Sequence, residues 1–326
     1  MLVPPLPAAA SSARMQQANM DLRSRLETTS TELVTGRHAD LTAHLSGRIG
    51  DAMLSGKVLE DLATQREHFS LKGNRLTLVQ LALQMAQDGT QGVEVATLDA
   101  LARDDGPALE LAARDARDAL EQVFEALNTR HGDRFLFSGD QTGTPPLSAV
   151  EDLLDDVRDL ALGAPTPGDF EAALDTYFED PAGGWATAIY QGTPTASDPD
   201  AMLAIDPAIT EMVRGLSVIA VSASSSAPPL FAADMTIISG AAETLSGGRD
   251  ALVSRRADIG RLQENIDNRL SRLDVEETIA TELFNAMTAR DPYEAATELR
   301  ELETNLQASY LLSSRLADLT FVNYVR

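Results

Sequence analysis

The 326-residue sequence contains no cysteine, which excludes disulfides, thiolate metal sites and thiol nucleophiles. This suits the cytosol, and it suits equally a protein that folds only after leaving the cell. Aromatic residues make up only 5% of the chain, and Trp185 is its single tryptophan. Small and straight side chains dominate instead, and these allow long helices to pack closely. Composition therefore favours a mainly helical protein.

Basic residues are also few, with 26 Lys and Arg against 50 Asp and Glu and a net charge of −24. Phosphates and anionic lipids would repel such a surface, so we expect no nucleic-acid partner and no membrane partner. No stretch approaches the ~18 apolar residues of a membrane span. Residues 1–11 are apolar but interrupted by prolines and lack a positively charged leader. We expect a disordered tail there and no cleaved signal peptide.

Recognisable catalytic motifs are missing. The sequence has no nucleophile elbow, no P-loop lysine and no dinucleotide fingerprint. His38 and His44 are six residues apart, which on a helix would put them on separate faces and argues against a ligand pair. The 198–200 segment, Asp-Pro-Asp, could hold a cation, but a turn is the commoner use of such a sequence. We predict no enzymatic activity, no cofactor and no metal.

The clearest pattern that is present is a seven-residue apolar repeat, in a stretch without proline from 230 to 291. Such a repeat predicts a long helix with one seam against another helix. Roughly 50 helical residues would extend about 75 Å, so we predict an elongated rod. An ordinary protein core would also produce such periodicity. The repeat consists of Leu245, Leu252, Ile259, Ile266, Leu273, Ala280 and Met287.

Apolar periodicity predicts helices over most of the remaining chain, and the middle differs by its glycines, prolines and short alternating runs. Helices are predicted at 12–35, from between 42 and 51 to 87, at 92–130 with a break at Gly106-Pro107, and at 151–162, 168–178, 207–222, 231–289 and 293–324. Strands are predicted at 135–137, 185–190 and 202–205.

These elements predict a mainly α fold. It is an elongated antiparallel helical bundle or coiled coil, formed by the N- and C-terminal segments, with a small inserted α+β domain. The predicted parts are a disordered tail (1–11), the N-terminal helical half of the rod (12–135), the inserted outer domain (136–206) and the C-terminal helical half (207–326).

Both extreme helices are amphipathic, with leucines at three- and four-residue spacing. These helices flank a separate insertion, so in a lone chain their apolar faces would be incompletely covered. We hypothesise that they form an assembly seam, by pairing with each other or with neighbouring copies. The seam consists of Leu22, Leu26, Leu33, Leu299, Leu302, Leu306, Leu316 and Leu319.

Several segments resemble one family. Residues 15–36, MQQANMDLRSRLETTSTELVTG, resemble the N-terminal helix of flagellins and of the flagellar hook-associated protein 3 family. Residues 133–147, DRFLFSGDQTGTPPL, are similar to that second family's aromatic strand, Gly and Thr-x-Pro-Phe segment. Residues 189–192 and 203–205 are similar to its strand pair, and 291–325 resemble the C-terminal helix of the whole flagellin superfamily. The chain is thus most similar to the hook–filament junction proteins.

Two positions depart from the family pattern. His38-Ala39-Asp40-Leu41 follows Gly36, where the family has a polar Asn/Ser-Asp-Asp-Pro turn. Leu147 stands where the family has phenylalanine.

The resemblance implies a structural component of the bacterial flagellum that joins hook to filament. It implies export through the flagellar export apparatus, with an export chaperone, and an extracellular location in the flagellum. It also implies terminal helices that become ordered on assembly and an insertion that faces outward. The implied partners are copies of the chain in a ring, the neighbouring hook-associated protein and flagellin.

Three alternatives remain open on the sequence. A filament flagellin, major or minor, differs in copy number and neighbours. An enzyme would use the acidic cluster of the insertion. A cytosolic coiled-coil adaptor would never leave the cell.

Overall fold

A computed structural model describes residues 8–223 and 227–324, with side chains described for 13–223 and 227–315. The described chain is mainly helical, as predicted, and divides into two compact units. The terminal unit comprises residues 1–67 and 271–326, and the central unit comprises 68–270. The division falls within two helices, α3 (Ile49–Gly89) and α10 (Thr236–Thr288). Within the described residues, no helix is both long and apolar enough to cross a membrane.

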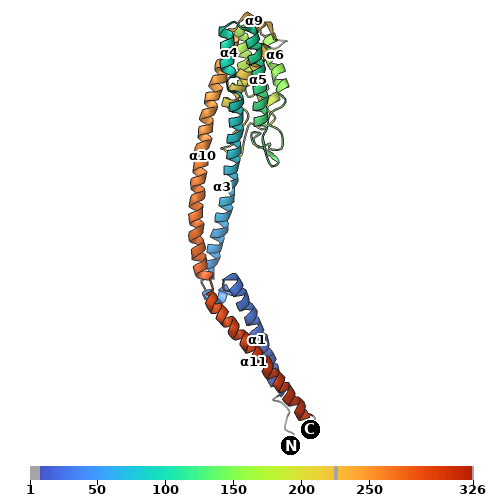
Figure 1. The fold of residues 1–326 in the computed structure, drawn as a ribbon, viewed down its shortest axis with the longest axis vertical. Coiled ribbons are helices and arrows are strands. Elements are labelled where there is room, and N and C mark those ends of the chain that lie inside the picture. The colour runs from blue at the N-terminus through green and yellow to red at the C-terminus, as the bar shows by residue number, and fades with distance from the viewer. Residues whose placement is uncertain (1–7, 224–226, 325–326) are drawn as a thin grey trace. The chain divides into compact units, whose positions relative to one another are not determined.

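The terminal unit contains α1 (Ala8–Thr35), α2 (Leu41–Leu45), α11 (Pro292–Tyr324) and the adjoining parts of α3 and α10. Helices α1 and α11 pack side by side (Figure 1). They are antiparallel, because Arg25 pairs with Glu298 whereas Glu32, further along α1, pairs with Arg290. An isolated bridge, Arg37 to Ala289, joins the α1–α2 link to the α10–α11 link.

Local signals explain where these helices begin and end. Gly36, with φ +68°, ends α1, and the carboxylate of Asp40 caps α2 by accepting the Ala43 N–H at 2.9 Å. Ser46 and Gly47, both with positive φ, separate α2 from α3. Helix α3 begins at Ile49, inside the predicted range of 42–51, and the short helix α2 was not predicted. Helix α1 begins at Ala8 rather than at residue 12. Residues 1–7 of the predicted tail lie outside the described residues.

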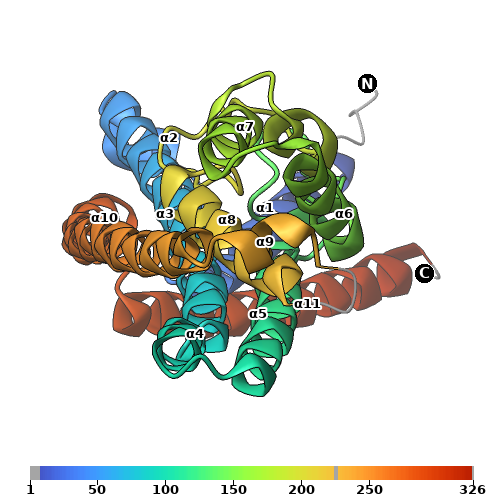
Figure 2. The ribbon, with the colours of Figure 1, turned by 90° about the horizontal axis from the view of Figure 1, so that it is seen from above.

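The central unit adds seven helical segments to its parts of α3 and α10. Its only described strands, β1 (Arg130–His131) and β2 (Arg134–Phe135), form one antiparallel pair. Helix α8 contacts α5, α6 and α7, which lie around it in the view of Figure 2. Thirteen of the sixteen residues of α8 are buried. The segments are α4 (Val93–Ala102), α5 (Gly106–Leu127), α6 (Val150–Gly163), α7 (Pro167–Glu179), the π-helix η1 (Trp185–Ile189), α8 (Pro207–Ser222) and α9 (Pro229–Ala233).

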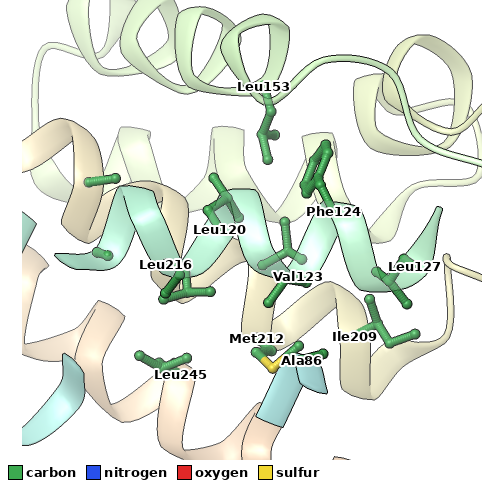
Figure 3. Close-up of a cluster of buried hydrophobic side chains, with 14 of the residues drawn as sticks. Ala86, Leu120, Val123, Phe124, Leu127, Leu153, Ile209, Met212, Leu216 and Leu245 are labelled. Carbon is green, nitrogen blue, oxygen red and sulfur yellow. The ribbon is translucent and has the colours of Figure 1, made fainter. Parts of the chain in front are cut away.

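One hydrophobic core holds the central unit together. Figure 3 shows Leu120, Val123 and Phe124 of α5 between Leu153 of α6 on one side and Leu216 of α8 on the other. The same cluster includes residues of α3 and α10. The predicted insertion 136–206 therefore shares its core with the helices before and after it. Its identity as a separate domain stays a prediction.

Two strand predictions were wrong. Residues 185–189 form η1, in which the Tyr190 N–H donates to the Trp185 carbonyl at 2.9 Å. Trp185 and Ile189 are four residues apart, a spacing that serves one helical face as well as an alternating strand, and both are buried. Residues 202–205 form irregular backbone and a turn.

The predicted helix 231–289 is also interrupted at Asp234, whose carboxylate caps the start of α10.

Candidate assembly surface

The heptad seam of α10 faces the protein's own core. Its first five members, from Leu245 to Leu273, are buried, and Ala280 and Met287 are half-buried. In the central unit α3 covers this side, with Gly73 allowing close approach to Ile266. Because its apolar residues are already covered within one chain, this seam is not the exposed surface that assembly would need.

Glutamine side chains of α3 also bind α10 in the central unit. The side-chain amide of Gln80 donates to the Arg256 carbonyl at 2.6 Å, and the Arg256 guanidinium donates to Gln87 Oε1 at 2.6 Å. The Gln263 amide donates to Thr77 Oγ1 at 3.2 Å. Residues later in α3 pair with residues earlier in α10, so the two helices run antiparallel.

The predicted seam on the terminal helices is partly covered within the chain. Leu302 is only 3% exposed, and its predicted partners are half-buried where their side chains are described. Leu316 and Leu319 lie on α11, but their side chains are outside the described residues. An assembly role for these residues stays a prediction. The half-buried members are Leu22, Leu26, Leu33, Leu299 and Leu306.

Polar contacts on the surface link α1 to α11. Arg23 Nε donates to the Tyr310 hydroxyl at 2.8 Å, and its guanidinium lies over the same ring at 5.5 Å. Arg25 pairs with Glu298 at 3.0 Å, and Arg290 pairs with the same carboxylate at 2.7 Å. The contacts made by the exposed Arg23 and Arg25 contribute about 0–1 kcal/mol each, whereas the Arg290 side chain is only 14% exposed. The exposed contacts orient the two helices more than they stabilise them.

The terminal unit leaves many large apolar side chains in water. Tyr293 is 84% exposed and Leu311 is 66% exposed, while Val275, Ile279 and Leu283 follow one another at four-residue spacing along one side of α10. Among the described side chains this unit exposes twelve large hydrophobic residues and buries only four, Leu45, Leu62, Leu273 and Leu302. The exposed set is Met20, Val34, Met53, Leu54, Val58, Val275, Ile279, Leu283, Tyr293, Tyr310, Leu311 and Leu312.

Most of these exposed residues were not predicted from the sequence. The apolar repeats used for the prediction mark helix faces that the chain itself covers. The signal that could have found part of the exposed set is the second apolar line on α10, Val275, Ile279 and Leu283, which lies off the heptad positions. Exposed apolar surface beyond a few scattered residues is typical of an interaction site. The candidate functional site is therefore the outer surface of the terminal unit.

Two histidines that were predicted to lie apart are in contact. The rings of His38 and His44 stack with centroids 3.7 Å apart. The prediction failed because residues 36–40 are a link between helices, which turns back so that His38 meets the last turn of α2. His68 and His131 are exposed. No group of three or more metal-ligating side chains occurs in the part of the chain that was described.

The carboxylates of the 198–200 segment pair with a lysine side chain of α3. Lys72 Nζ lies 3.2 Å from Asp198 and 2.6 Å from Asp200, and Arg75 lies 3.8 Å from Asp198. The Asp200 N–H donates to the Asp198 carboxylate at 3.1 Å, as in the predicted turn. Burial opposes the charge of Lys72, but its hydrogen bonds to both aspartates outweigh this and raise its pKa. This segment is thus a clamp that ties the 193–200 loop to α3.

A pocket of about 620 Å³ lies between α6 and α7. Its lining includes Asp156, Asp159, Asp169 and Tyr177 but no histidine, serine or lysine. The Tyr177 hydroxyl donates to Asp156 at 2.6 Å, and burial followed by this hydrogen bond raises the pKa of Tyr177. The phenol is therefore a neutral donor at physiological pH.

Comparison with models of known protein families found no match, and comparison with curated proteins found none either.

Proposed function

We propose that this protein is a structural subunit of the bacterial flagellum that joins the hook to the filament and assembles through its terminal unit. The family named in this proposal is inferred from the sequence resemblance alone. The observation that supports assembly is the exposed apolar surface of the terminal unit, whose described side chains expose twelve large hydrophobic residues and bury four. In this proposal the protein has no enzymatic activity and no cofactor, and it acts outside the cell.

Burial explains why the terminal unit needs neighbours. Fully covering a side chain such as Leu311 or Ile279 contributes about 1.5–3 kcal/mol relative to leaving it in water. Among the described side chains of α1 and α11, only two hydrophobic residues are buried, and both lie on α11: Ala295 and Leu302. Helices with so little internal packing are marginal in water. Copies of the same chain, the neighbouring hook-associated protein and flagellin would supply the missing contacts.

The finer architecture belongs to the same proposal. We infer that α3 and α10 form an antiparallel coiled coil and that residues 136–206 face away from the assembly axis. The buried heptad seam of α10 supports the coiled coil. Export through the flagellar export apparatus, with an export chaperone, completes the proposal. Slow hydrogen exchange at residues 12–35 and 300–326 of the free monomer would contradict coupling of their folding to assembly.

Labelling of flagella tests the function. The chain has no cysteine, so Asp133→Cys provides a single reactive thiol on a fully exposed side chain of the β1–β2 turn. Sheared flagella are treated with maleimide–biotin and gold-labelled streptavidin and viewed by electron microscopy. A single band at the distal end of the hook is expected. The strain with the unsubstituted protein controls for thiols of other flagellar proteins.

The alternatives predict other outcomes of the same experiment. A filament flagellin would carry gold along the filament, and a cytosolic adaptor would leave sheared flagella unlabelled.

Deletion of the gene is expected to leave hooks without filaments while flagellin is secreted into the medium. Residual short filaments in the deletion strain would favour a minor flagellin.

A further inference from the structure

We propose that the crossing of the α1–α2 link and the α10–α11 link is a proton-sensitive latch, closed while His38 and His44 are neutral and opened when both are protonated. The latch comprises residues 32–45 and 288–298, all within the terminal unit. It is a conformational device that would operate in the free subunit. It therefore does not depend on the assembly proposed above.

Backbone hydrogen bonds join the two links directly. The His38 N–H donates to the Thr288 carbonyl at 3.0 Å, and the Arg290 N–H donates to the Gly36 carbonyl at 3.0 Å. The Arg37–Ala289 bridge lies between these two bonds. The links connect α1 to α2 and α10 to α11, so these bonds govern how the α1–α11 pair is attached to the rest of its unit.

A buried carboxylate lies beside this crossing. Glu32 is only 9% exposed and accepts the Ala39 N–H at 2.9 Å, which holds the link against α1. Its other oxygen lies 3.6 Å from Arg290 Nε, and His38 Nδ1 lies 3.7 Å from its first oxygen. The Glu32 carboxylate thus already pairs with one group that stays positively charged at every pH of interest, the guanidinium of Arg290.

The stacked imidazoles add two groups that become cations in acid. His38 faces His44 on α2, Glu32 on α1, Arg290 on the α10–α11 link and Glu294 on α11. Glu294 and Glu298 also pair with Arg290, at 3.8 and 2.7 Å. Glu32 can balance a first proton on His38, but a second proton on His44 would place two like charges in rings 3.7 Å apart.

The direction of the pH effect follows from proton linkage. Burial, and then the neighbouring His44, lower the pKa of His38 below 6.5, and the opposing effect of Glu32 does not restore it. The closed latch therefore binds protons more weakly than the open latch. Its stability is complete above about pH 6.5 and is lost as the pH falls through that value towards the lowered pKa.

Hydrogen exchange of the full-length monomer tests the latch. Protection factors, corrected for the intrinsic effect of pH, are measured from about pH 7.5 to about pH 5 for segments 36–45 and 286–292. We expect protection there to fall about tenfold for each unit by which an imidazole pKa rises on opening. Protection of α5, in the central unit, should not change.

Variants assign the effect to the stacked pair. The double variant His38→Gln/His44→Gln is expected to lose the pH-dependent fall, whereas His68→Gln, at an exposed position of α3, should keep it. A constant protection factor across the range in the wild-type protein would overturn the latch. A fall that persists unchanged in the double variant would also overturn it.

Titration of the wild-type protein covers the case in which the double variant does not fold. The NMR signals of the His38 imidazole should show it taking up its proton below about pH 6.5, the ordinary value for histidine. Titration of His38 at or above that value would contradict the proposal.

Discussion

The indole N–H of Trp185 donates a hydrogen bond to Thr210 Oγ1 across 3.1 Å in the core of the central unit. Trp185 lies on η1 and is 1% exposed, and its ring packs against Phe124 and Phe178. Thr210 lies in the first turn of α8. The contact therefore connects the predicted insertion to the helix that follows it. A buried indole N–H without an acceptor would be costly, so this bond helps to fix the position of α8.

Replacement of Thr210 by valine is expected to lower the free energy of unfolding by about 1–3 kcal/mol, because the side-chain shape is kept while the acceptor for the buried indole is lost. Urea denaturation followed by the fluorescence of Trp185, the only tryptophan, measures this change. Thr176→Val on the exposed side of α7 is the matched control and should change stability by less than about 0.5 kcal/mol. Equal stability of the two variants would show that the indole bond contributes nothing.

Local signals explain why most helices were predicted. Aspartate before a proline or a Gly-Pro pair marks the starts of α5, α8 and α11, at Asp105, Asp206 and Asp291. In each case the carboxylate accepts a backbone N–H of the first turn, and the proline suits a position without a hydrogen-bond partner. The predicted range 207–222 is the observed range of α8.

Features that depend on distant residues were not predictable in this way. The 185–190 alternation fits a strand and a helix equally, and only burial of Trp185 against α5 and α7 decides between them. The contact of His38 with His44 depends on the path of a link, which apolar periodicity does not report. The same periodicity marks a helix face that will be covered, but not whether the cover comes from the same chain or from a neighbour. The candidate site was therefore only partly predicted.

Substitution of Lys72 tests the clamp on the 193–200 loop. Lys72→Met keeps the aliphatic chain but leaves the Asp198 and Asp200 carboxylates without their shared ammonium group. We expect a loss of about 1–2 kcal/mol of stability and faster proteolysis within the loop. The control is Lys57→Met, the only other lysine, which pairs with Asp61 in solvent and should leave stability essentially unchanged.

The clamp also predicts a pH dependence. Burial tends to raise the pKa of Asp198, but hydrogen bonds from the Asp200 N–H and Lys72 outweigh this and hold the pKa below 3.8. A lowered carboxylate pKa contributes stability that is complete above the unfolded value and lost as the pH falls through the folded value. The difference in unfolding free energy between wild type and Lys72→Met should therefore be constant from about pH 7 to about pH 5 and shrink below about pH 4. A difference that disappears already at neutral to mildly acidic pH would contradict this assignment.

Glycines of two helices should respond to alanine in opposite directions. A Cβ at Gly215 of α8 would lie 2.6 Å from the Ala241 carbonyl and 2.7 Å from the Leu245 N–H nitrogen, so Gly215→Ala must separate α8 from α10. We expect a loss of about 1–3 kcal/mol. Gly240→Ala, in α10 with open space around it, should gain about 0.5–1 kcal/mol from helix propensity. Thermal unfolding of the two variants gives both signs in one experiment.

The exposed face of α11 provides the sharpest test of assembly. Leu311 projects into solvent, so Leu311→Asp should leave the unfolding free energy of the monomer within about 0.5 kcal/mol of wild type. In an interface, however, the new carboxylate would be buried without a partner, at a cost of several kcal/mol. We therefore expect the variant to be absent from sheared flagella and the cells to be non-motile. Asn305→Asp adds the same charge at an exposed position elsewhere on the helix and should still be incorporated. Incorporation of Leu311→Asp at the wild-type level would show that subunits meet through a different surface.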